Sequence, residues 1–239
     1  MSASVKGSES GSETPKEVTV VCVSYKRYRE IHVLINSLLS QTLQNWKLLI
    51  IHDGPDAQME AEVKPYLERY PELIRFQCTE TRYNDYGHTL RKMGIEMADT
   101  EFVLLTNDDN YYARKFLEYM FEAIREQNLD MVLCNMIHSH KNPGAYKQLD
   151  YNVFDSYPTI FYIDVGNFIL RTTHAKGVGF NDTSFNADGV FVEDVLKAHN
   201  VESLIPSLRH NLRFLFRKND PTKKTLRIGK VDRVLFVHN

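Results

Sequence analysis

The 239-residue chain is 43% hydrophobic and 25% charged, and its formal net charge is −2. This composition is typical of a globular domain and excludes a mostly disordered or fibrous protein, while the near-neutral charge gives no reason to expect a nucleic-acid partner. No run of about 18 apolar residues is present, and three distant cysteines without a CxxC spacing predict buried, reduced thiols in a cytoplasmic protein.

The first 16 residues are mainly Ser, Gly and Glu, and we predict a disordered tail there. After the tail, buried apolar runs alternate with segments of helical periodicity. Strands are predicted at 18–24, 46–52, 74–78, 101–106 and 131–137, and helices at 29–41, 57–70, 89–97 and 113–127. This alternation predicts an α/β fold, Rossmann-like, with a mainly parallel sheet flanked by helices.

The second half of the chain is less regular. An irregular stretch is predicted at 151–158, a strand at 163–170 and a helix that begins at 193 and reaches 199. From Arg209 to the end the formal charge is +7, so the rest of the chain carries −9. The small net charge therefore combines an acidic body with a basic C-terminal segment.

Polar residues follow three of the predicted strands, and ligands of open α/β sheets bind beyond such strand ends. Ser24 and Tyr25 follow the first strand, Asp53 the second, and Asp108–Asp109 the fourth. An isolated Asp such as Asp53 is explained equally well as a helix cap. Two adjacent carboxylates repel each other, and a divalent cation such as Mg²⁺ or Mn²⁺ would relieve that repulsion. The pair therefore predicts a metal site.

Several common site motifs are absent from the sequence. There is no GxGxxG, no P-loop, no GxSxG and no HExxH. We expect His138 and His140 to lie in a surface loop. An acidic element runs from Asp188 to Asp194, and it is explained either by helix capping or by a general base, without a preference from spacing alone.

Taken together, the motifs resemble family 2 glycosyltransferases with the GT-A fold. The resemblance covers roughly residues 18–199, and its matching motifs are VTVVCVSYKR, LLSQT, WKLLIIHDG, ADTEFVLLTNDDNYY, VGNFILR, VGF and VED. It implies a glycosyltransferase that moves a sugar from a nucleotide diphosphate donor, by default a UDP-sugar, to an acceptor hydroxyl. The implied acceptor is a saccharide or a lipid-linked molecule.

The resemblance also implies roles for individual residues. Asp194 is the implied general base of an inverting enzyme, with Glu193 beside it. Mn²⁺ or Mg²⁺ is bound by Asp108 and Asp109, and we favour Asp109 as the main ligand. The implied donor-binding residues are Ser24, Tyr25, Asp53, Arg91, Asp108, Gly166 and Asn167. The chain departs from the family pattern at His52 and Thr106, where acids are common.

The expected organisation is a tail at 1–16 followed by one domain at 17–239. That domain has a nucleotide-sugar half at 17–110, an acceptor and catalytic half at 111–208 and the basic segment at 209–239. This segment is interpreted as a solvated face, as a lid over the diphosphate that brings His238 to the metal, or as a contact with anionic membranes or an acidic acceptor, in which 209–217 form an amphipathic helix. Rival functions are a sugar nucleotidyltransferase and a catalytically degenerate binding module.

Overall fold

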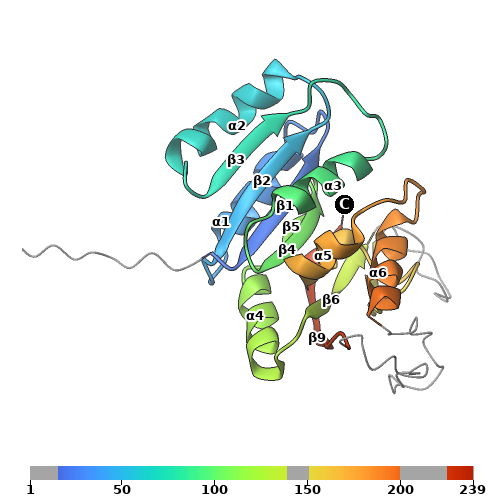
Figure 1. Cartoon of the computed structure of the whole chain (residues 1–239). Helices are drawn as coiled ribbons and strands as arrows, with labels where there is room; N and C mark the ends of the chain where they lie inside the picture. Colours follow the sequence, from blue (N-terminus) through green and yellow to red (C-terminus); the bar gives the residue numbers. More distant parts are fainter. Residues whose placement is uncertain (1–15, 139–150, 200–224, 239) are drawn as a thin grey trace, which may run out of the picture.

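The computed structural model describes residues 16–138, 151–199 and 225–238 (Figure 1). Residues 1–15 of the predicted tail, His140 and the predicted amphipathic segment at 209–217 lie outside these residues. The helices and strands are β1 (Val18–Ser24), α1 (Glu30–Leu39), β2 (Trp46–His52), α2 (Ala57–Arg69), β3 (Ile74–Cys78), α3 (His88–Met97), β4 (Phe102–Asn107), β5 (Tyr111–Tyr112), α4 (Phe116–Gln127), β6 (Met131–His138), β7 (Asn152–Phe154), η1 (Val165–Asn167), β8 (Phe168–Arg171), α5 (Thr172–Val178), α6 (Ala187–Ala198) and β9 (Ile228–Val237).

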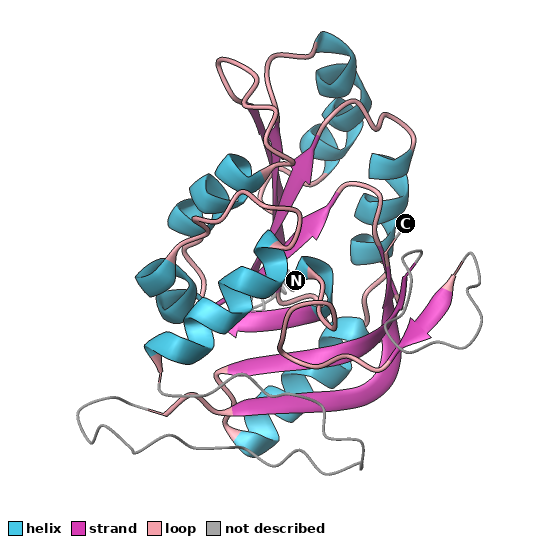
Figure 2. Ribbon diagram, turned by 90° about the vertical axis from the view of Figure 1, so that its right-hand side faces the viewer, coloured by secondary structure: helices cyan, strands magenta, loops and turns pink. Residues whose placement is uncertain are grey.

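The described strands form one nine-stranded sheet in the order β3-β2-β1-β4-β8-β6-β9-β5, with β7 paired to β6. Strands β1 to β4 are mutually parallel, as the alternating pattern predicted. Beyond β4 the sheet is mixed, because β8 runs antiparallel to both β4 and β6 while β9 runs parallel to β6. Helices α1, α2 and α4 cover one face of the sheet, and α3, α5 and α6 cover the other (Figures 1 and 2).

Strand β1 lies at the centre of the fold, and all seven of its residues are buried. Its β-branched side chains alternate between two cores, as expected for a strand covered on both faces. On the α3 side, a Cβ atom at Gly94 would lie 2.1 Å from Cγ1 of Val21. Glycine at this position therefore allows α3 to pack closely on β1. Cys22 and Cys134 are buried and free, as predicted, whereas Cys78 is free but only partly buried; burial raises the pKa of the Cys22 thiol.

The second half differs from the prediction in several ways, among them β7, which lies within the stretch predicted to be irregular, and α5, which was not predicted. The predicted strand at 163–170 is a 3₁₀ turn followed by the short β8, because Asp164 accepts a hydrogen bond from the Gly166 N–H and caps the turn. Helix α6 begins at Ala187 rather than at 193. Strand β9, unpredicted, lies in the basic C-terminal segment and joins that segment to β6 and β5.

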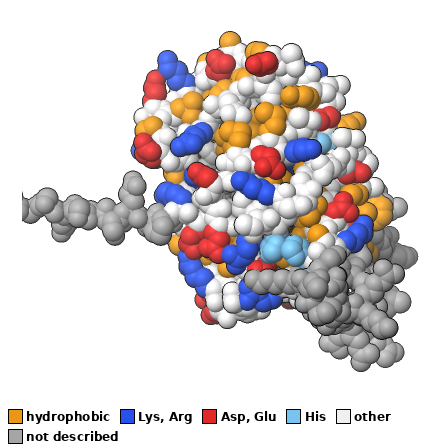
Figure 3. Space-filling model, in the orientation of Figure 1, with side chains coloured by type: hydrophobic (Ala, Val, Ile, Leu, Met, Phe, Trp, Pro, Cys, Tyr) orange, Lys and Arg blue, Asp and Glu red, His pale blue; other side chains and the backbone are white. Residues whose placement is uncertain are grey.

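Two surface properties complete the description. None of the helices in the described ranges is both long and apolar enough to cross a membrane. On the face shown in Figure 3, acidic and basic side chains are interspersed, so this face shows no field of a single sign.

Asp130, directly before β6, links this strand to the end of β8 and to the residue before β9. Its carboxylate accepts hydrogen bonds from Arg171 at 3.1 Å and from the backbone and side chain of Arg227 at 3.0–3.2 Å. Burial opposes ionisation, yet the bonds from Arg227 and Arg171 lower the pKa of Asp130 to about 2. We expect Asp130→Ala to lower the free energy of unfolding by about 2–3 kcal/mol, since both arginines are partly solvated.

Urea titration at pH 7 measures this loss. The control is Asp99→Ala, which removes the exposed partner of Lys47 and is expected to change stability by less than about 0.5 kcal/mol. The native state favours ionised Asp130, so its contribution is present above the unfolded pKa of about 4 and disappears as the pH falls toward 2. Equal losses in the two variants would contradict this role of Asp130.

Candidate active site

A pocket of about 960 Å³ opens at the carboxyl ends of β1, β2 and β4. The beginnings of α3 and α6 and the ends of β6 and β9 complete its walls. Its polar lining includes Ser24, Tyr25, Arg27, Asp53, Arg82, Asn84, His88, Arg91, Asn107, Asp108, His138, Asp164, Asn186, Asp188 and His238. The pocket therefore lies where the parallel half of the sheet predicts a ligand.

Asp108 is held at the pocket wall by the end of β1. Its Oδ2 accepts hydrogen bonds from the Ser24 hydroxyl at 2.7 Å and from the Tyr25 N–H at 3.1 Å. Burial raises the pKa of Asp108 to about 6, although these bonds and the charge of Arg27 favour the carboxylate. The structure thus brings together three residues predicted at the site: Ser24, Tyr25 and Asp108.

Asp109 is buried beside Asp108 but does not line the pocket. Its Oδ2 forms an ion pair with Arg27, whose Nε lies 3.6 Å from Oδ1 of Asp108. The Oδ1 of Asp109 has no hydrogen-bond partner in the described part of the chain. The carboxylate repulsion predicted a divalent metal ion here; the cation that this structure places at the pair is the half-exposed guanidinium of Arg27.

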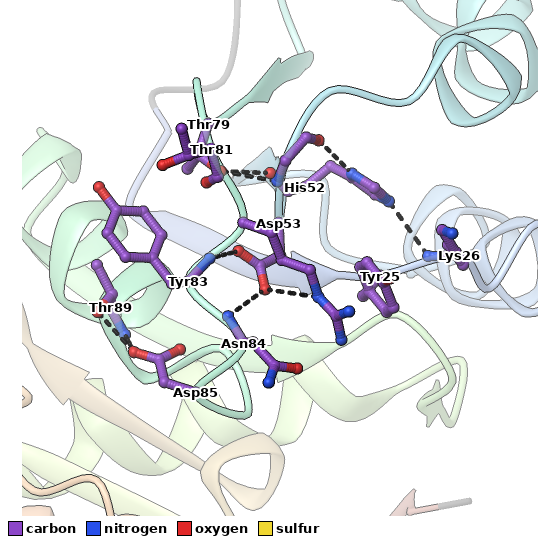
Figure 4. Close-up of polar contacts among 12 residues, drawn as sticks. Tyr25, Lys26, His52, Asp53, Thr79, Thr81, Tyr83, Asn84, Asp85 and Thr89 are labelled. Atoms are coloured by element: carbon purple, nitrogen blue, oxygen red, sulfur yellow. Dashed lines mark hydrogen bonds and ion pairs between the residues drawn. The ribbon is translucent and has the colours of Figure 1, made fainter.

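Asp53, predicted to bind the donor, fixes the loop between β3 and α3. Its carboxylate accepts from the N–H of Tyr83 at 2.7 Å and of Asn84 at 3.0 Å, so both oxygens have partners (Figure 4). Arg82, from the same loop, lies 3.9 Å from the centre of the Tyr25 ring. Arg82 and Tyr25 thus form a flat, cationic and aromatic surface suited to a planar ring.

His52, which stands where the family pattern has an acid, holds two loops together. Its Nε2 accepts from the Lys26 N–H at 3.2 Å, and its Nδ1 lies 2.7 Å from the Gly54 carbonyl oxygen (Figure 4). These contacts require a neutral ring with its hydrogen on Nδ1. The Tyr25 ring stacks on this imidazole at 5.8 Å, so His52 also supports the Tyr25 surface.

Arg91 lies in the middle of the pocket and joins α3 to the end of β4. Its guanidinium donates to the Asn107 side-chain oxygen at 2.5 Å and to the Tyr86 carbonyl oxygen at 2.8 Å. Burial lowers its pKa, while the charges of Asp164 and Asp188 oppose that shift. Arg91, predicted to bind the donor, therefore lines the pocket.

A second acidic residue that lines the pocket is Asp188. The two acids predicted to be catalytic, Glu193 and Asp194, do not line it. Asp188 lies in the first turn of α6 and faces the pocket; burial, followed by the charge of Asp164, raises its pKa to about 7. Asp194 has a 47% exposed side chain and pairs with Lys197 at 3.2 Å. Asp194 lies six residues after Asp188, which corresponds to about 600° of rotation along the helix, or about 240° beyond one full turn. Asp194 therefore points away from the pocket that Asp188 faces.

Glu193 also lies outside the pocket. Its Oε1 accepts from the Thr159 hydroxyl at 3.0 Å and from the Ile160 N–H at 3.3 Å. Glu193 therefore fixes the loop that precedes η1. This role was not expected from the sequence.

Three further potential ligands meet at the far end of the pocket. Nε2 of His138 and Nε2 of His238 lie 3.9 Å and 3.8 Å from Oδ2 of Asp164. One ligand atom from each residue falls within 4.8 Å of the others, which suits a metal ion. The two imidazole rings stack at 4.1 Å. The expectation of a surface loop was wrong for His138, which is the last residue of β6 and is buried under Phe154 and His238.

Gly166 and Asn167, predicted to bind the donor, support the wall from behind. The Asn167 amide donates to the Cys134 carbonyl oxygen and to the Ser156 hydroxyl, and Asn167 is fully buried. A Cβ atom at Gly166 would lie 2.3 Å from the Phe236 ring. Neither residue lines the pocket. Both therefore act through packing and hydrogen bonds in this structure.

This packing gives a stability prediction with a matched control. Gly166→Ala is expected to lower the free energy of unfolding by about 1–3 kcal/mol, because the rigid Phe236 ring must move. Gly177→Ala, in α5, meets no atom within 4 Å and is expected to be neutral or slightly stabilising. Thermal or urea unfolding of the two variants checks the difference, and an unchanged stability of Gly166→Ala would rule out the close contact.

Known proteins resemble this chain in sequence and in fold. A family model described as Glycosyl transferase family 2 matches residues 19–189. The poly(ribitol-phosphate) beta-N-acetylglucosaminyltransferase TarP of Staphylococcus aureus is 25% identical over 120 residues, which are 49% of this chain and 36% of TarP. The chain thus spans about a third of that relative's length.

Two solved structures resemble the whole described domain. The S. aureus TarS 1–349 complex with UDP-GlcNAc has a TM-score of 0.63 at 19% identity, over 93% of this chain and 58% of that one. The mannosyltransferase PcManGT of Pyrobaculum calidifontis, in complex with GDP-Man and Mn²⁺, has a TM-score of 0.62 at 14% identity, over 94% and 57%. These similarities confirm the fold class predicted from the sequence.

Proposed function

Because the chain belongs to glycosyl transferase family 2, we propose that it transfers a sugar from a nucleotide diphosphate donor to an acceptor hydroxyl. The observation that carries this proposal is a single pocket that holds an aromatic and cationic surface, buried carboxylates and a partly buried carboxyl of raised pKa. The complexes of TarS with UDP-GlcNAc and of PcManGT with GDP-Man support a nucleotide-sugar donor.

In this proposal the nucleotide lies at the ends of β1 and β2. The base stacks at the surface formed by Tyr25 and Arg82, and Asp53 contributes by fixing the loop of Arg82. The diphosphate then extends toward Asp108 and Arg91. A cation is needed near Asp108, because carboxylates on the wall otherwise repel the phosphates.

The chain also carries residues that fit Mn²⁺ or Mg²⁺. Asp108 is one candidate ligand, and the group of His138, Asp164 and His238 elsewhere in the same pocket would also suit the ion, since carboxylate oxygens and imidazole nitrogens both suit Mn²⁺. When bound, the ion stabilises the negative charge on the departing diphosphate. The complex of PcManGT with Mn²⁺ supports this part of the proposal.

Asp188 is the proposed general base. Its carboxylate takes the proton of the acceptor hydroxyl while the hydroxyl oxygen bonds to the anomeric carbon and the bond to the diphosphate oxygen breaks. Its raised pKa suits this task, since a base with a pKa near 7 is deprotonated in part at neutral pH and accepts a proton readily. Attack from the face opposite the diphosphate would make the transfer inverting.

A donor screen tests the proposal. UDP, dTDP and GDP are added with Mn²⁺ in a thermal-shift experiment, in which a ligand at 100 times its Kd adds about 2.7 kcal/mol of stability. The matching nucleotide sugars are then assayed for release of nucleoside diphosphate. Pyrophosphate release from a nucleoside triphosphate would indicate a nucleotidyltransferase instead. Binding without any release, over the whole panel of donors, would indicate a binding module.

A further inference from the structure

Three large aromatic side chains line the pocket and yet are strongly exposed. The exposed fractions are 81% for Tyr86, 64% for Phe161 and 78% for Phe185. They come from three different loops, before α3, between β7 and η1, and between α5 and α6; the last is the orange loop beyond α5 in Figure 1. Exposed apolar side chains that gather at one pocket mouth mark a binding surface.

Two of these residues also have a strained backbone. Tyr86 has a φ of 58° and Phe161 a φ of 70°, in the left-handed region that bulky residues rarely adopt. Such strained residues persist only where the surrounding structure holds them in place, and they gather at ligand-binding sites. Around Phe161, the Tyr157 N–H donates to the Tyr162 carbonyl oxygen and closes a tight loop. The strain therefore coincides with an exposed ring at the pocket mouth.

The loop that carries Phe161 is fixed next to Asp188. Glu193 binds the Ile160 N–H at 3.3 Å, and a Cβ atom at Gly189 would lie 2.7 Å from the Ile160 Cα. Gly189 follows Asp188 directly, so the start of α6 lies against the residue before Phe161. Phe185 precedes Asp188 by less than one helical turn. Phe161 and Phe185 thus belong to two loops that both adjoin the start of α6, where Asp188 lies.

From this arrangement we infer that Phe161 and Phe185 form the acceptor subsite and that the acceptor is a neutral saccharide. This inference rests on the proposed function, because it takes Asp188 as the base that faces the acceptor hydroxyl. The C–H bonds on one face of a pyranose ring carry partial positive charge and pack on the negative face of an aromatic ring. One hydroxyl of the same sugar then points to Asp188.

The charges at this end of the pocket also favour a neutral acceptor. Asp188, beside Asp164, repels a polyanion when it is ionised, whereas neutral hydroxyl groups donate hydrogen bonds to its carboxylate. Arg91, the cation that faces these two acids, is buried and bonded to Asn107 and Tyr86. The described residues at this wall therefore suit a different acceptor from the poly(ribitol-phosphate) named for TarP.

The test is saturation-transfer-difference NMR of the full chain with UDP and diamagnetic Mg²⁺, using a panel of methyl hexopyranosides and, separately, a ribitol-phosphate oligomer. We expect signals on the ring C–H protons of at least one glycoside and a Kd that rises about five- to one-hundredfold in Phe161→Ala and in Phe185→Ala, the range found for ring stacking. Phe185→Trp keeps the ring and is expected to retain binding, whereas Phe185→Leu is not. Tyr111→Ala, an exposed ring outside this pocket, is the matched control.

The measurements distinguish a failure of the acceptor subsite from a failure of the proposed function. Donor binding, measured by thermal shift on the same variants, reports on the proposed function and on folding. Intact donor binding without any glycoside signal, or with unchanged affinity in both alanine variants, would overturn the acceptor subsite alone. Binding retained in Phe185→Leu would point to a lipid chain, and a preference for the ribitol-phosphate oligomer would point to a polyanion; either outcome overturns the inference.

Discussion

Asp188→Asn is expected to lower kcat by about 10²–10⁴-fold and to leave donor affinity nearly unchanged. The Asn amide has almost the same shape as the carboxyl. Its oxygen still accepts the hydrogen bond from the Gly189 N–H, which is 2.8 Å long in the native protein. It cannot take a proton from the acceptor hydroxyl, so the contribution of general base catalysis is lost. Initial rates at saturating acceptor, together with calorimetric donor titration, measure the two effects separately.

Asp194→Asn is the matched control on the same helix. Asp194 is about half exposed and contacts Lys197, so the substitution is expected to change kcat by less than about twofold and stability by less than about 0.5 kcal/mol. A large loss of kcat in Asp194→Asn with full activity in Asp188→Asn would return the base to the residue predicted from the sequence. Loss of donor binding in Asp188→Asn would show instead that Asp188 binds the donor.

The pH profile gives an independent measurement of the same residue. Asp188 is active as a base only when it is deprotonated, so kcat is expected to fall about tenfold per pH unit below a pKa of about 7. Burial and the charge of Asp164 raise this pKa, while the charge of Arg91 lowers it. In Asp188→Asn the residual rate should lose this acid limb. A limb that persists unchanged would belong to another group.

The parallel half of the fold was readable from the sequence because burial on both faces leaves a continuous apolar run. The predicted strands at 46–52 and 74–78 have the bounds of β2 and β3. The start of α6 was not readable, because the first turn consists of Ala187, Asp188 and Gly189, which carry no apolar period. The small size of Gly189 is required by its contact with Ile160, and only the tertiary structure shows that contact.

Some residues of the candidate site could likewise be predicted from the sequence, and others could not. Ser24, Tyr25 and Asp108 come directly after central strands, and parallel pairing brings such residues together. His138 and His238 are a hundred residues apart, with no spacing motif to connect them. They meet because β6 and β9 pair in parallel and the His238 N–H donates to the Ile137 carbonyl oxygen. Long-range pairing of this kind leaves no local signal in the sequence.

Asp108→Asn is expected to weaken binding of the selected nucleoside diphosphate in Mn²⁺ by at least about 100-fold, because metal affinity falls by 10–100-fold even for lesser changes around a ligand. Asn accepts the bonds from Ser24 and the Tyr25 N–H through its oxygen, so the wall is expected to keep its shape. What it loses is the negative charge that holds a cation against the phosphates. Calorimetric titration with Mn²⁺ and with EDTA measures this loss.

Asp109→Asn separates the contributions of the two adjacent acids to nucleotide binding in Mn²⁺. Asp109 lies behind the pocket wall and pairs with Arg27, so its substitution is expected to weaken binding by less than about tenfold. In EDTA, the native protein and Asp108→Asn should bind the nucleotide with similar, low affinity, because the shared cation is absent from both. A larger loss in Asp109→Asn would make Asp109 the main ligand, as the sequence suggested. An EDTA-insensitive affinity of the native protein would instead leave Arg27 as the cation that Asp108 holds against the diphosphate.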